Sequence, residues 1–237
     1  MTDVLAVGAH PDDLELTMGG TAIVLVEKGL DVHFVDLTAG EPARHAPPGE
    51  REEQAARAAE ILGVTRSQLD LQDRLLRDTV EARLRLARMI RDHRPSFVFT
   101  THGGGVHPDH GAVTDLVVGA VFYARLPKWE RVPGGEMLEG TEPYEIDRLF
   151  LGHCRMEEPW DRFDFAVDVT RHYDRKLEAV AVYESVFGTD RDGLIEKYGA
   201  EDRYTGSLVD VPYAEPFRAR RRLLVEDPTV FRPVRYG

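Results

Sequence analysis

The feature that most constrains the fold is an uninterrupted apolar run, Val4–Ala9 (VLAVGA), near the start of the 237-residue chain. An apolar run without polar alternation is typical of a strand buried on both faces of a parallel sheet. Ala22–Lys28 then has a good helix sequence that ends at a glycine, and Val32–Thr38 (VHFVDLT) returns to strand character. This order predicts a strand–helix–strand unit whose helix begins near Gly19 or Gly20.

The alternation of strand and helix patterns continues along the chain. Further helices are expected over Arg51–Leu62, along a stripe of Leu76, Val80, Leu84, Ala87 and Ile90, and over Gly111–Tyr123 and Arg171–Val182; further strands are expected at Ser96–Thr101, Arg148–His153 and Phe163–Val169. This pattern predicts an α/β fold, a Rossmann-like and mostly parallel sheet sandwiched by helices. Lys128–Tyr144, rich in Pro, Gly and Glu, is predicted to be a long loop.

No Ser/Gly-rich or Pro-rich linker divides the chain. We therefore expect one domain over residues 1–237, with residues 186–237 as a C-terminal extension of it. Beyond Ser185 the patterns that distinguish helix from strand become weak.

Charge and composition narrow the classes of function. The chain has 30 basic and 42 acidic residues, a net charge of −12, which disfavours nucleic acid and anionic lipid as partners because phosphates attract basic surfaces. A small soluble substrate is expected instead. The single cysteine, Cys154, excludes an internal disulfide and fits a reducing compartment, and the N-terminus shows no secretory signal. With apolar runs far too short for a membrane span, the expected location is cytoplasmic.

Two clusters of imidazole and carboxylate follow apolar strands. His10-Pro-Asp-Asp13 comes directly after the first strand, and His107-Pro-Asp-His110 follows the strand at Ser96–Thr101. Each cluster alone has a structural explanation, since Asp favours helix starts and a His-x-x-His pattern occurs by chance. Their joint occurrence at the carboxyl ends of two strands, where open α/β sheets bind ligands, predicts one divalent-metal site.

The residue types at this site suit a catalytic metal centre. Such a centre typically has three protein ligands and one open position, and imidazole and carboxylate suit metals of the zinc class. His10, Asp13 and His110 can supply that set. Asp12 then stays close to the metal as a candidate general base, and His107 is a second group that is not needed as a metal ligand. Two histidines and one aspartate suit both zinc and iron(II).

These residues carry a resemblance to a known family. Ala9–Glu15 (AHPDDLE), Met18–Gly20 and His107–His110 resemble the signature of the zinc-dependent N-acetylglucosaminyl deacetylases of the LmbE/PIG-L family. Further segments are most similar to the branch that acts in bacillithiol biosynthesis: Asp36–Thr38 with Gly40 and Glu41, Ala59–Gly63, Gln72–Arg74, Gly206–Val209 and Tyr213–Phe217. The resemblance spans about residues 3–217. It implies removal of an N-acetyl group from an N-acetylglucosamine-containing molecule, N-acetylglucosaminyl malate being one such substrate.

The resemblance also implies individual roles and an assembly state. Residues of the two motifs would bind the metal and perform catalysis: zinc at His10, Asp13 and His110, a general base at Asp12, a group at His107 that stabilises the oxyanion or protonates the leaving amine, and Asp109 orienting a histidine. Arg51 and Asp73 would hold sugar hydroxyls or an aglycone carboxylate. Family members often form hexamers, so a homo-oligomer is expected.

Departures from the family pattern concern specificity more than chemistry. Ala39 replaces an arginine, Val186 stands where the branch usually has glutamine, and a triple glycine, Gly103–Gly105, precedes the second motif. A deacetylase or amidase acting on another glycoconjugate, such as a thiol conjugate, a chito-oligosaccharide or an antibiotic intermediate, is an alternative. So is a non-catalytic metal- or sugar-binding protein.

Two other functions are disfavoured by the residues themselves. A nucleotide-binding Rossmann protein would have a Gly-x-Gly-x-x-Gly turn after the first strand, whereas Gly8–Asp13 places carboxylates there that would repel a pyrophosphate. The basic run Arg218–Arg222 lies in an acidic chain, so it is expected to be a solvated segment or a donor of intersubunit salt bridges.

Overall fold

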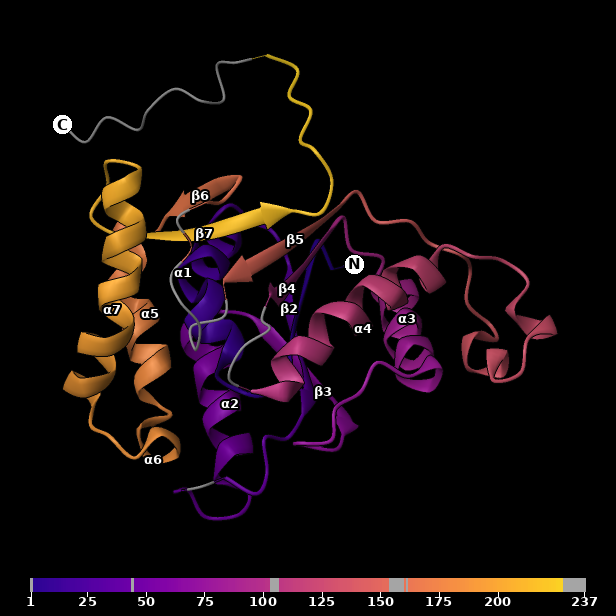
Figure 1. Ribbon diagram of the computed structural model, residues 1–237, viewed down its shortest axis with the longest axis horizontal. Helices are drawn as coiled ribbons and strands as arrows, with labels where there is room; N and C mark the ends of the chain where they lie inside the picture. The colour runs from indigo at the N-terminus through magenta and orange to yellow at the C-terminus, as the bar shows by residue number, and fades with distance from the viewer. Residues whose placement is uncertain (1, 44, 103–106, 154–159, 161, 228–237) are drawn as a thin grey trace.

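The computed structural model describes residues 2–227 apart from 44, 103–106, 154–159 and 161. Its strands are β1 (Val4–Gly8), β2 (Val32–Thr38), β3 (Thr65–Leu71), β4 (Phe97–His102), β5 (Arg148–His153), β6 (Phe165–Asp168) and β7 (Ala214–Ala219). They form one sheet in the order β3-β2-β1-β4-β5-β7-β6 (Figure 1). Cys154 and the triple glycine at 103–105 lie outside the described residues.

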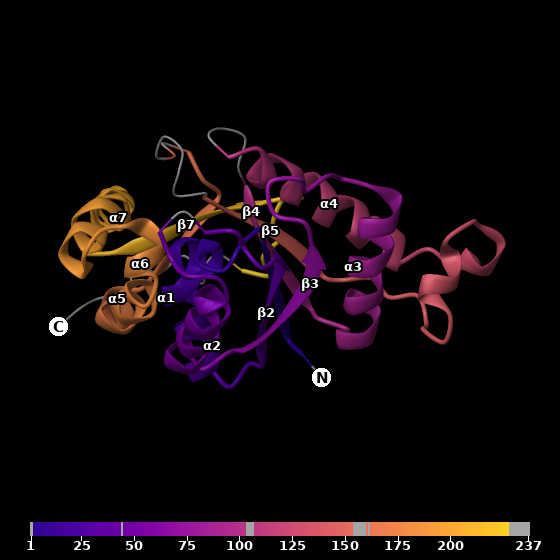
Figure 2. The same cartoon turned by 90° about the horizontal axis from the view of Figure 1, so that it is seen from below.

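Helices occupy both faces of this sheet. They are α1 (Asp13–Glu27), α2 (Glu50–Leu62), α3 (Val80–His93), α4 (Pro108–Ala124), α5 (Tyr173–Ala181), α6 (Glu184–Phe187) and α7 (Arg191–Leu208), with the short 3-10 helices η1 (Trp129–Arg131), η2 (Gly135–Leu138) and η3 (Thr170–His172). Seen from below in Figure 2, α3 and α4 cover one face, and α1, α2 and α5 cover the other. The predicted α/β sandwich with a mostly parallel sheet is confirmed.

The sheet is parallel from β3 to β5 and antiparallel at β7. β1 pairs in parallel with both β2 and β4, so that Val4 lies opposite Val32 on one side and Phe97 on the other. β7 runs antiparallel between β5 and β6. Because β7 belongs to residues 186–237, part of the predicted C-terminal extension supplies an internal strand of the sheet. The division into domains stays a prediction.

The alternation of side chains along β1 explains why the strand is apolar throughout. Leu5 and Val7 belong to a core shared with α3 and α4, whereas Val4 and Ala6 belong to a second core shared with α1, α2 and Phe34. Successive side chains of a strand point to opposite faces, so a strand covered on both faces needs apolar residues at every position.

The start of α1 differs from the prediction. The helix begins at Asp13 and not near Gly19 or Gly20, although a kink at Met18, with φ of −147°, interrupts it just before the two glycines. Gly20 is required for close packing, because a Cβ at this position would lie 2.6 Å from the Cβ of Val169. The glycine pair therefore marks a contact between elements, and the helix start is set by the turn at Asp13.

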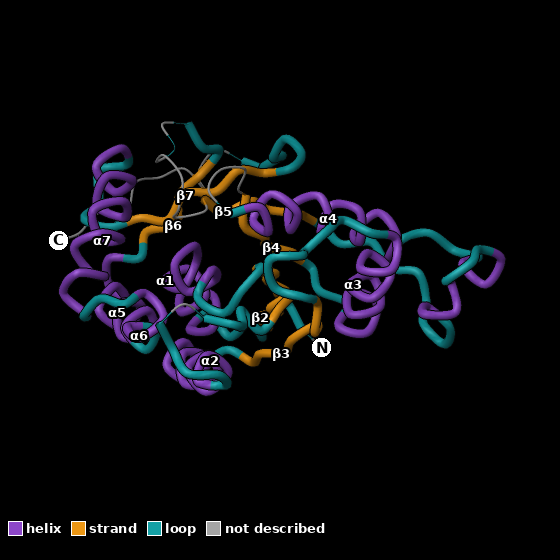
Figure 3. Tube along the Cα trace, turned by 60° about the horizontal axis from the view of Figure 1, so that its bottom comes forward, coloured by secondary structure: helices purple, strands orange, loops and turns teal. Residues whose placement is uncertain are grey.

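Other departures are elements that were not predicted and helix ends that were placed differently. The prediction missed β3, α7 and β7, and it began α4 at Gly111 where the helix begins at Pro108. The segment predicted as a long loop, Lys128–Tyr144, contains η1 and η2 and projects beyond α3 (Figure 3). Within the described part of the chain, no helix has both the length and the apolar character needed to cross a membrane.

A buried histidine on β2 makes the stability of the fold sensitive to acid. His33 on β2 is 7% exposed, and its ring nitrogens lie 2.7 Å from the hydroxyl oxygens of Thr65 and Ser67. Burial, aided by the charge of nearby His93, lowers the pKa of His33 from 6.5 to about 4. The unfolded chain therefore binds a proton at a higher pH than the folded chain does.

We predict that the free energy of unfolding of His33→Gln falls less with decreasing pH than that of the wild type. As pH falls from 6.5 to about 4 the wild type should lose stability on the order of 3 kcal/mol, since each pKa unit corresponds to about 1.4 kcal/mol. Glutamine does not titrate, so this loss should shrink, while the two proteins should show parallel behaviour above pH 7. Urea midpoints measured across this pH range test the prediction. An equal change of the midpoint with pH in both proteins would contradict it.

Candidate functional site

The parallel pairing of β1 and β4 brings the two motifs to one edge of the sheet. The chain leaves β1 at Gly8 and places His10 just beyond it, and the chain after β4 reaches α4, whose N-cap is His107. His110 follows one turn into α4 and is buried. The two motifs therefore lie together at the carboxyl ends of two neighbouring strands, where the sequence places the predicted site.

Asp13 organises the turn after β1. Its Oδ2 atom accepts hydrogen bonds from the backbone N–H groups of Ala9 and His10, both at 2.9 Å, and its Oδ1 atom lies 3.1 Å from Nε2 of His110. Burial alone would raise the pKa of the Asp13 carboxyl. His110 and His10 outweigh that effect and hold the pKa well below its usual range. The side chain is thus a stable carboxylate between two imidazoles.

Three imidazoles gather beside this carboxylate. The ring centroid of His10 lies 4.7 Å from that of His107 and 5.3 Å from that of His110, and the centroids of His107 and His110 are 5.1 Å apart. One ligand nitrogen from each ring lies within 4.8 Å of the others. His107, predicted as a catalytic group, therefore also lies within ligand distance of the predicted metal ligands.

Carboxylates surround His10 on the other side. Its Nε2 atom lies 3.1 Å from Asp73 and 3.2 Å from Asp109, and its Nδ1 atom lies 3.6 Å from Asp13. Burial lowers the pKa of His10, but hydrogen bonds to Asp109, Asp13 and Asp73 more than compensate and raise it far above its usual value. This surplus of negative charge around a buried imidazole is the pattern that a bound divalent cation neutralises.

The donor set fits such a cation. Imidazole nitrogens and carboxylate oxygens converge, and Oδ1 of Asp109 is buried without a hydrogen-bond partner among the described residues. A buried acceptor without a donor is costly unless an ion or water satisfies it. The predicted ligands His10, Asp13 and His110 are in pairwise proximity, and their assignment as the ligand set stays a prediction.

Asp12, the predicted base, has an unusual environment. It is the N-cap of α1, yet its carboxylate makes no capping hydrogen bond and instead accepts from Nη2 of Arg51 at 2.6 Å. Burial raises the pKa of the Asp12 carboxyl to about 6, against the opposing charge of Arg51. The group is therefore poised to exchange a proton near neutral pH.

One pocket of about 400 Å³ unites most of the predicted site. Seven of its lining residues were predicted from sequence: His10, Asp12, Asp13, Arg51, Asp73, His107 and His110. Asp109, which is 1% exposed, does not line the pocket, and its Oδ2 atom accepts a hydrogen bond from the backbone N–H of Arg74 at 2.7 Å.

Several residues of this pocket were not predicted from the sequence. Arg74 lies on its rim with a side chain that is 58% exposed, and Val186, Phe187 and Tyr198 form an apolar wall. The sequence distinguished Val186 only as a departure from the family pattern. No local pattern marked Tyr198, because it reaches the pocket from α7.

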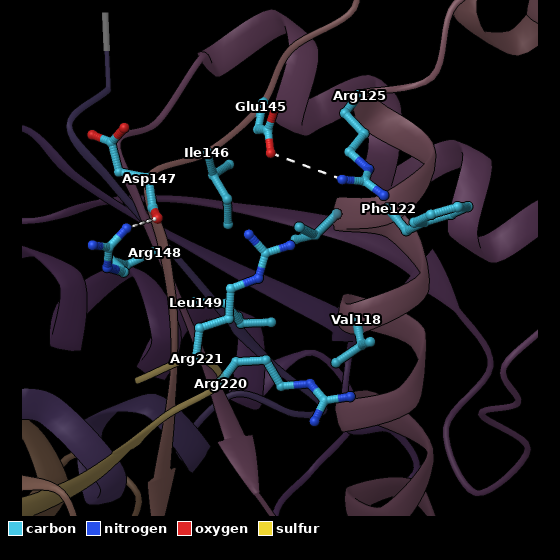
Figure 4. Close-up of a pocket in the computed structure, with 11 residues that line it drawn as sticks. Val118, Phe122, Arg125, Glu145, Ile146, Asp147, Arg148, Leu149, Arg220 and Arg221 are labelled. Carbon is cyan, nitrogen blue, oxygen red and sulfur yellow. Dashed lines mark hydrogen bonds and ion pairs between the residues drawn. The ribbon is translucent and has the colours of Figure 1, made fainter. Parts of the chain in front are cut away.

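A second pocket, of about 290 Å³, lies at the amino end of β5 (Figure 4). It combines an apolar floor with arginines on its rim, among them Arg125, Arg148, Arg220 and Arg221. None of the predicted site residues lines it. Arg220 and Arg221 of the basic run therefore lie at the end of the sheet opposite to the histidines of the site.

A mostly parallel α/β sheet with imidazoles and carboxylates in one pocket at its carboxyl edge defines a candidate metal-dependent hydrolase. Comparison with known proteins agrees with this class. The family model for GlcNAc-PI de-N-acetylases, PIG-L, matches residues 5–121. Diacetylchitobiose deacetylase of Thermococcus kodakarensis is 33% identical over 229 residues, which cover 91% of this chain and 82% of the relative.

Two further matches extend over most of the chain. A probable N-acetyl-alpha-D-glucosaminyl L-malate deacetylase 2 of Bacillus anthracis is 28% identical over 228 residues, covering 90% of this chain and 93% of the relative. The crystal structure of the conserved protein TT1542 from Thermus thermophilus aligns with a TM-score of 0.83 at 38% identity, covering 95% and 97% of the two chains. The chain belongs to the PIG-L/LmbE family, and it is an N-deacetylase of the hydrolase class.

We predict that His110→Ala removes the metal whereas Asp115→Asn, an exposed position on the same helix, retains it. The first change deletes an imidazole of the cluster, and the second alters only surface charge. Metal content after loading with zinc or iron(II) and dialysis should be about one ion per chain in the wild type and in the control. A saturating ion at 100 times its dissociation constant should also stabilise the wild type by about 2.7 kcal/mol. Full metal content in His110→Ala would contradict the ligand assignment.

Proposed function

We propose that this enzyme hydrolyses the N-acetyl group of a small molecule that contains N-acetylglucosamine. The observation that carries the proposal is the convergence of a buried carboxylate, Asp12, with three imidazoles in one pocket of about 400 Å³. That volume lies in the range of sites for small molecules. The relatives named as deacetylases support the same reaction.

The proposed ligands of the divalent cation are His10, Asp13 and His110. Asp13 already lies between the two histidines, with oxygen atoms 3.6 Å and 3.1 Å from their ring nitrogens. This set suits zinc and also iron(II). When bound, the cation would supply Lewis-acid polarisation of water and of the amide carbonyl.

Asp12 is the proposed general base. Its Oδ2 atom accepts from Arg51, so Oδ1 is the oxygen that would take a proton from the attacking water. A carboxyl with a pKa of about 6 can accept that proton and release it within the same turnover, because acid–base catalysis is most efficient when the pKa lies near the working pH. The proton would pass to the leaving nitrogen, yielding acetate and a free amine.

His107 is proposed to stabilise the oxyanion. The backbone N–H of Asp109 donates to Nδ1 of His107 at 3.3 Å, so Nδ1 is an acceptor and Nε2 carries the ring proton. Burial lowers the pKa of His107, and positive charge at His10 and His110, whether from protons or from a bound cation, lowers it further, which favours the neutral ring. Both observations support a neutral Nε2–H donor to the developing oxyanion in preference to a resting imidazolium acid.

The finer proposal concerns the aglycone. We propose that it is anionic, with malate as the first candidate, because Arg74 presents an exposed guanidinium on the pocket rim and the relative from Bacillus anthracis is named for a malate glycoside. Asp73 would hold sugar hydroxyls. Chitobiose is the main alternative, as in the Thermococcus relative, and a thiol conjugate or an antibiotic intermediate would need the same chemistry.

Other aspects of the proposal rest on the family resemblance and on composition. Assembly into a homo-oligomer, such as a hexamer, follows from the resemblance. We also propose a cytoplasmic location, because a lone cysteine fits a reducing compartment. Residues 1–237 are proposed to form a single deacetylase domain.

We predict that Asp12→Asn binds metal like the wild type but loses turnover by roughly 10²- to 10⁴-fold, the usual contribution of a general base. Asparagine keeps the size of the side chain and cannot accept the proton. Metal content and steady-state acetate release are measured on the same samples. A fully active Asp12→Asn would exclude Asp12 as the base.

The substrate prediction is tested with a panel of N-acetylglucosamine, its malate glycoside, its inositol glycoside and diacetylchitobiose. We expect metal-dependent acetate release with the highest kcat/KM for the malate glycoside, and Arg74→Ala should reduce that preference by raising KM. Highest activity on chitobiose would replace the anionic aglycone with an amino sugar. If no compound releases acetate while metal is bound, the site acts on another amide or only binds its ligand.

A further inference from the structure

The hydrogen bonds of Arg51 are almost fully used within the protein. Its Nε and Nη2 atoms donate to the carbonyl oxygen of Pro11 at 3.1 and 2.9 Å, Nη1 donates to the carbonyl oxygen of Gly40 at 2.8 Å, and Nη2 also donates to Asp12 at 2.6 Å. A guanidinium has five N–H donors, so about one remains for any other partner. The side chain is 11% exposed.

Asp12, which accepts a hydrogen bond from Arg51, has a strained backbone conformation. Asp12 adopts a φ of 111° and a ψ of −31°, a region that non-glycine residues avoid. Such a conformation persists only where the surroundings enforce it. Arg51 contacts the carbonyl of the preceding residue, Pro11, and the carboxylate of Asp12 itself, so it restrains both sides of the strained position.

Gly40 packs against the guanidinium of Arg51 and limits where it can move. A Cβ at this position would lie 2.6 to 2.8 Å from Nη1, Cζ and Nε of Arg51, and the φ of Gly40 is +65°. Its backbone therefore packs flat against the guanidinium. The loop itself is tied to the end of β1, because Thr38 accepts from the backbone N–H of Gly40 at 3.1 Å and donates to the carbonyl of Ala9 at 3.0 Å.

We propose that Arg51, packed against Gly40, is a positioning residue whose main contribution is to hold Asp12 in its strained, reactive conformation and not to bind the substrate. This inference rests on the proposed role of Asp12 as the base. Arg74 provides the contrast: its side chain is 58% exposed on the pocket rim, so it is the arginine that is accessible to a ligand.

The first test separates kcat from KM in Arg51→Lys and Arg51→Ala. A lysine can replace only part of the four hydrogen bonds, so kcat should fall by about 10²-fold while KM stays within about threefold and metal content is unchanged. Arg57→Lys, an exposed arginine on the same helix, is the matched control and should leave both constants unchanged. Added guanidinium should partly restore kcat in Arg51→Ala.

The second test uses glycines. Gly40→Ala introduces both backbone strain and a collision with Arg51, whereas Gly29→Ala introduces strain alone, because nothing lies within 4 Å of a Cβ there and its φ is +83°. We expect Gly40→Ala to reduce kcat as Arg51→Lys does and Gly29→Ala to keep the kcat of the wild type. Thermal unfolding of both variants separates the general cost of strain from the effect on the base.

The outcomes distinguish this inference from the proposed function. A rise in KM at constant kcat in Arg51→Lys would overturn the inference and make Arg51 a substrate-binding residue, with the base assignment of Asp12 intact. Unchanged kinetics in both Arg51→Lys and Gly40→Ala would also overturn it. Full activity of Asp12→Asn would instead overturn the proposed function, whatever the Arg51 variants do.

Discussion

The parallel pairing of β1 with β4 is the constraint on which the site depends. Val4 lies opposite Phe97 and Val7 opposite Thr100, so the two strands end at the same edge, and the motifs that follow them meet there. A shift of register by one residue would exchange Leu5 and Val7 with Val4 and Ala6 between the two cores. The two apolar layers therefore fix the register, and the register fixes the distance between His10 and His110.

Buried ion pairs hold α1, the helix that starts at the site, in its position. Arg66 forms ion pairs with Glu15 and Asp36, and Lys176 lies 2.6 Å from Asp202 and 2.8 Å from Glu215. Glu215 also accepts hydrogen bonds from the backbone of α1 at its kink. Burying these groups costs desolvation, and removing one partner would leave another charge unpaired, at a cost of about 3–5 kcal/mol. The networks thereby oppose any displacement of α1, whose first residue is Asp13.

The composition of the site was predictable because it is a local property. His10, Asp12, Asp13, His107 and His110 are grouped by two short motifs, and apolar strands precede both motifs. Contacts between distant residues were not predictable from pattern. Arg51 reaches Asp12 from a separate helix, Asp73 reaches His10 from the loop after β3, and Tyr198 reaches the pocket from α7. The resemblance to the family indicated Arg51 and Asp73, but only the geometry shows that the guanidinium is occupied by the protein itself.

The sequence by itself determined the central strands, the amphipathic helices and the identity of the motif residues, since each depends on the chemistry of neighbouring positions. Tertiary structure decided strands β3 and β7 and the helix starts. β3 (TRSQLDL) has no apolar run because it lies at the end of the sheet, where it forms hydrogen bonds to β2 on one side. β7 contains Glu215 and Pro216, which argue against an internal strand until Lys176 is seen to compensate the buried carboxylate. In these cases, contacts with residues far away in the sequence stabilise the strand. A short stretch of neighbouring residues therefore does not reveal it.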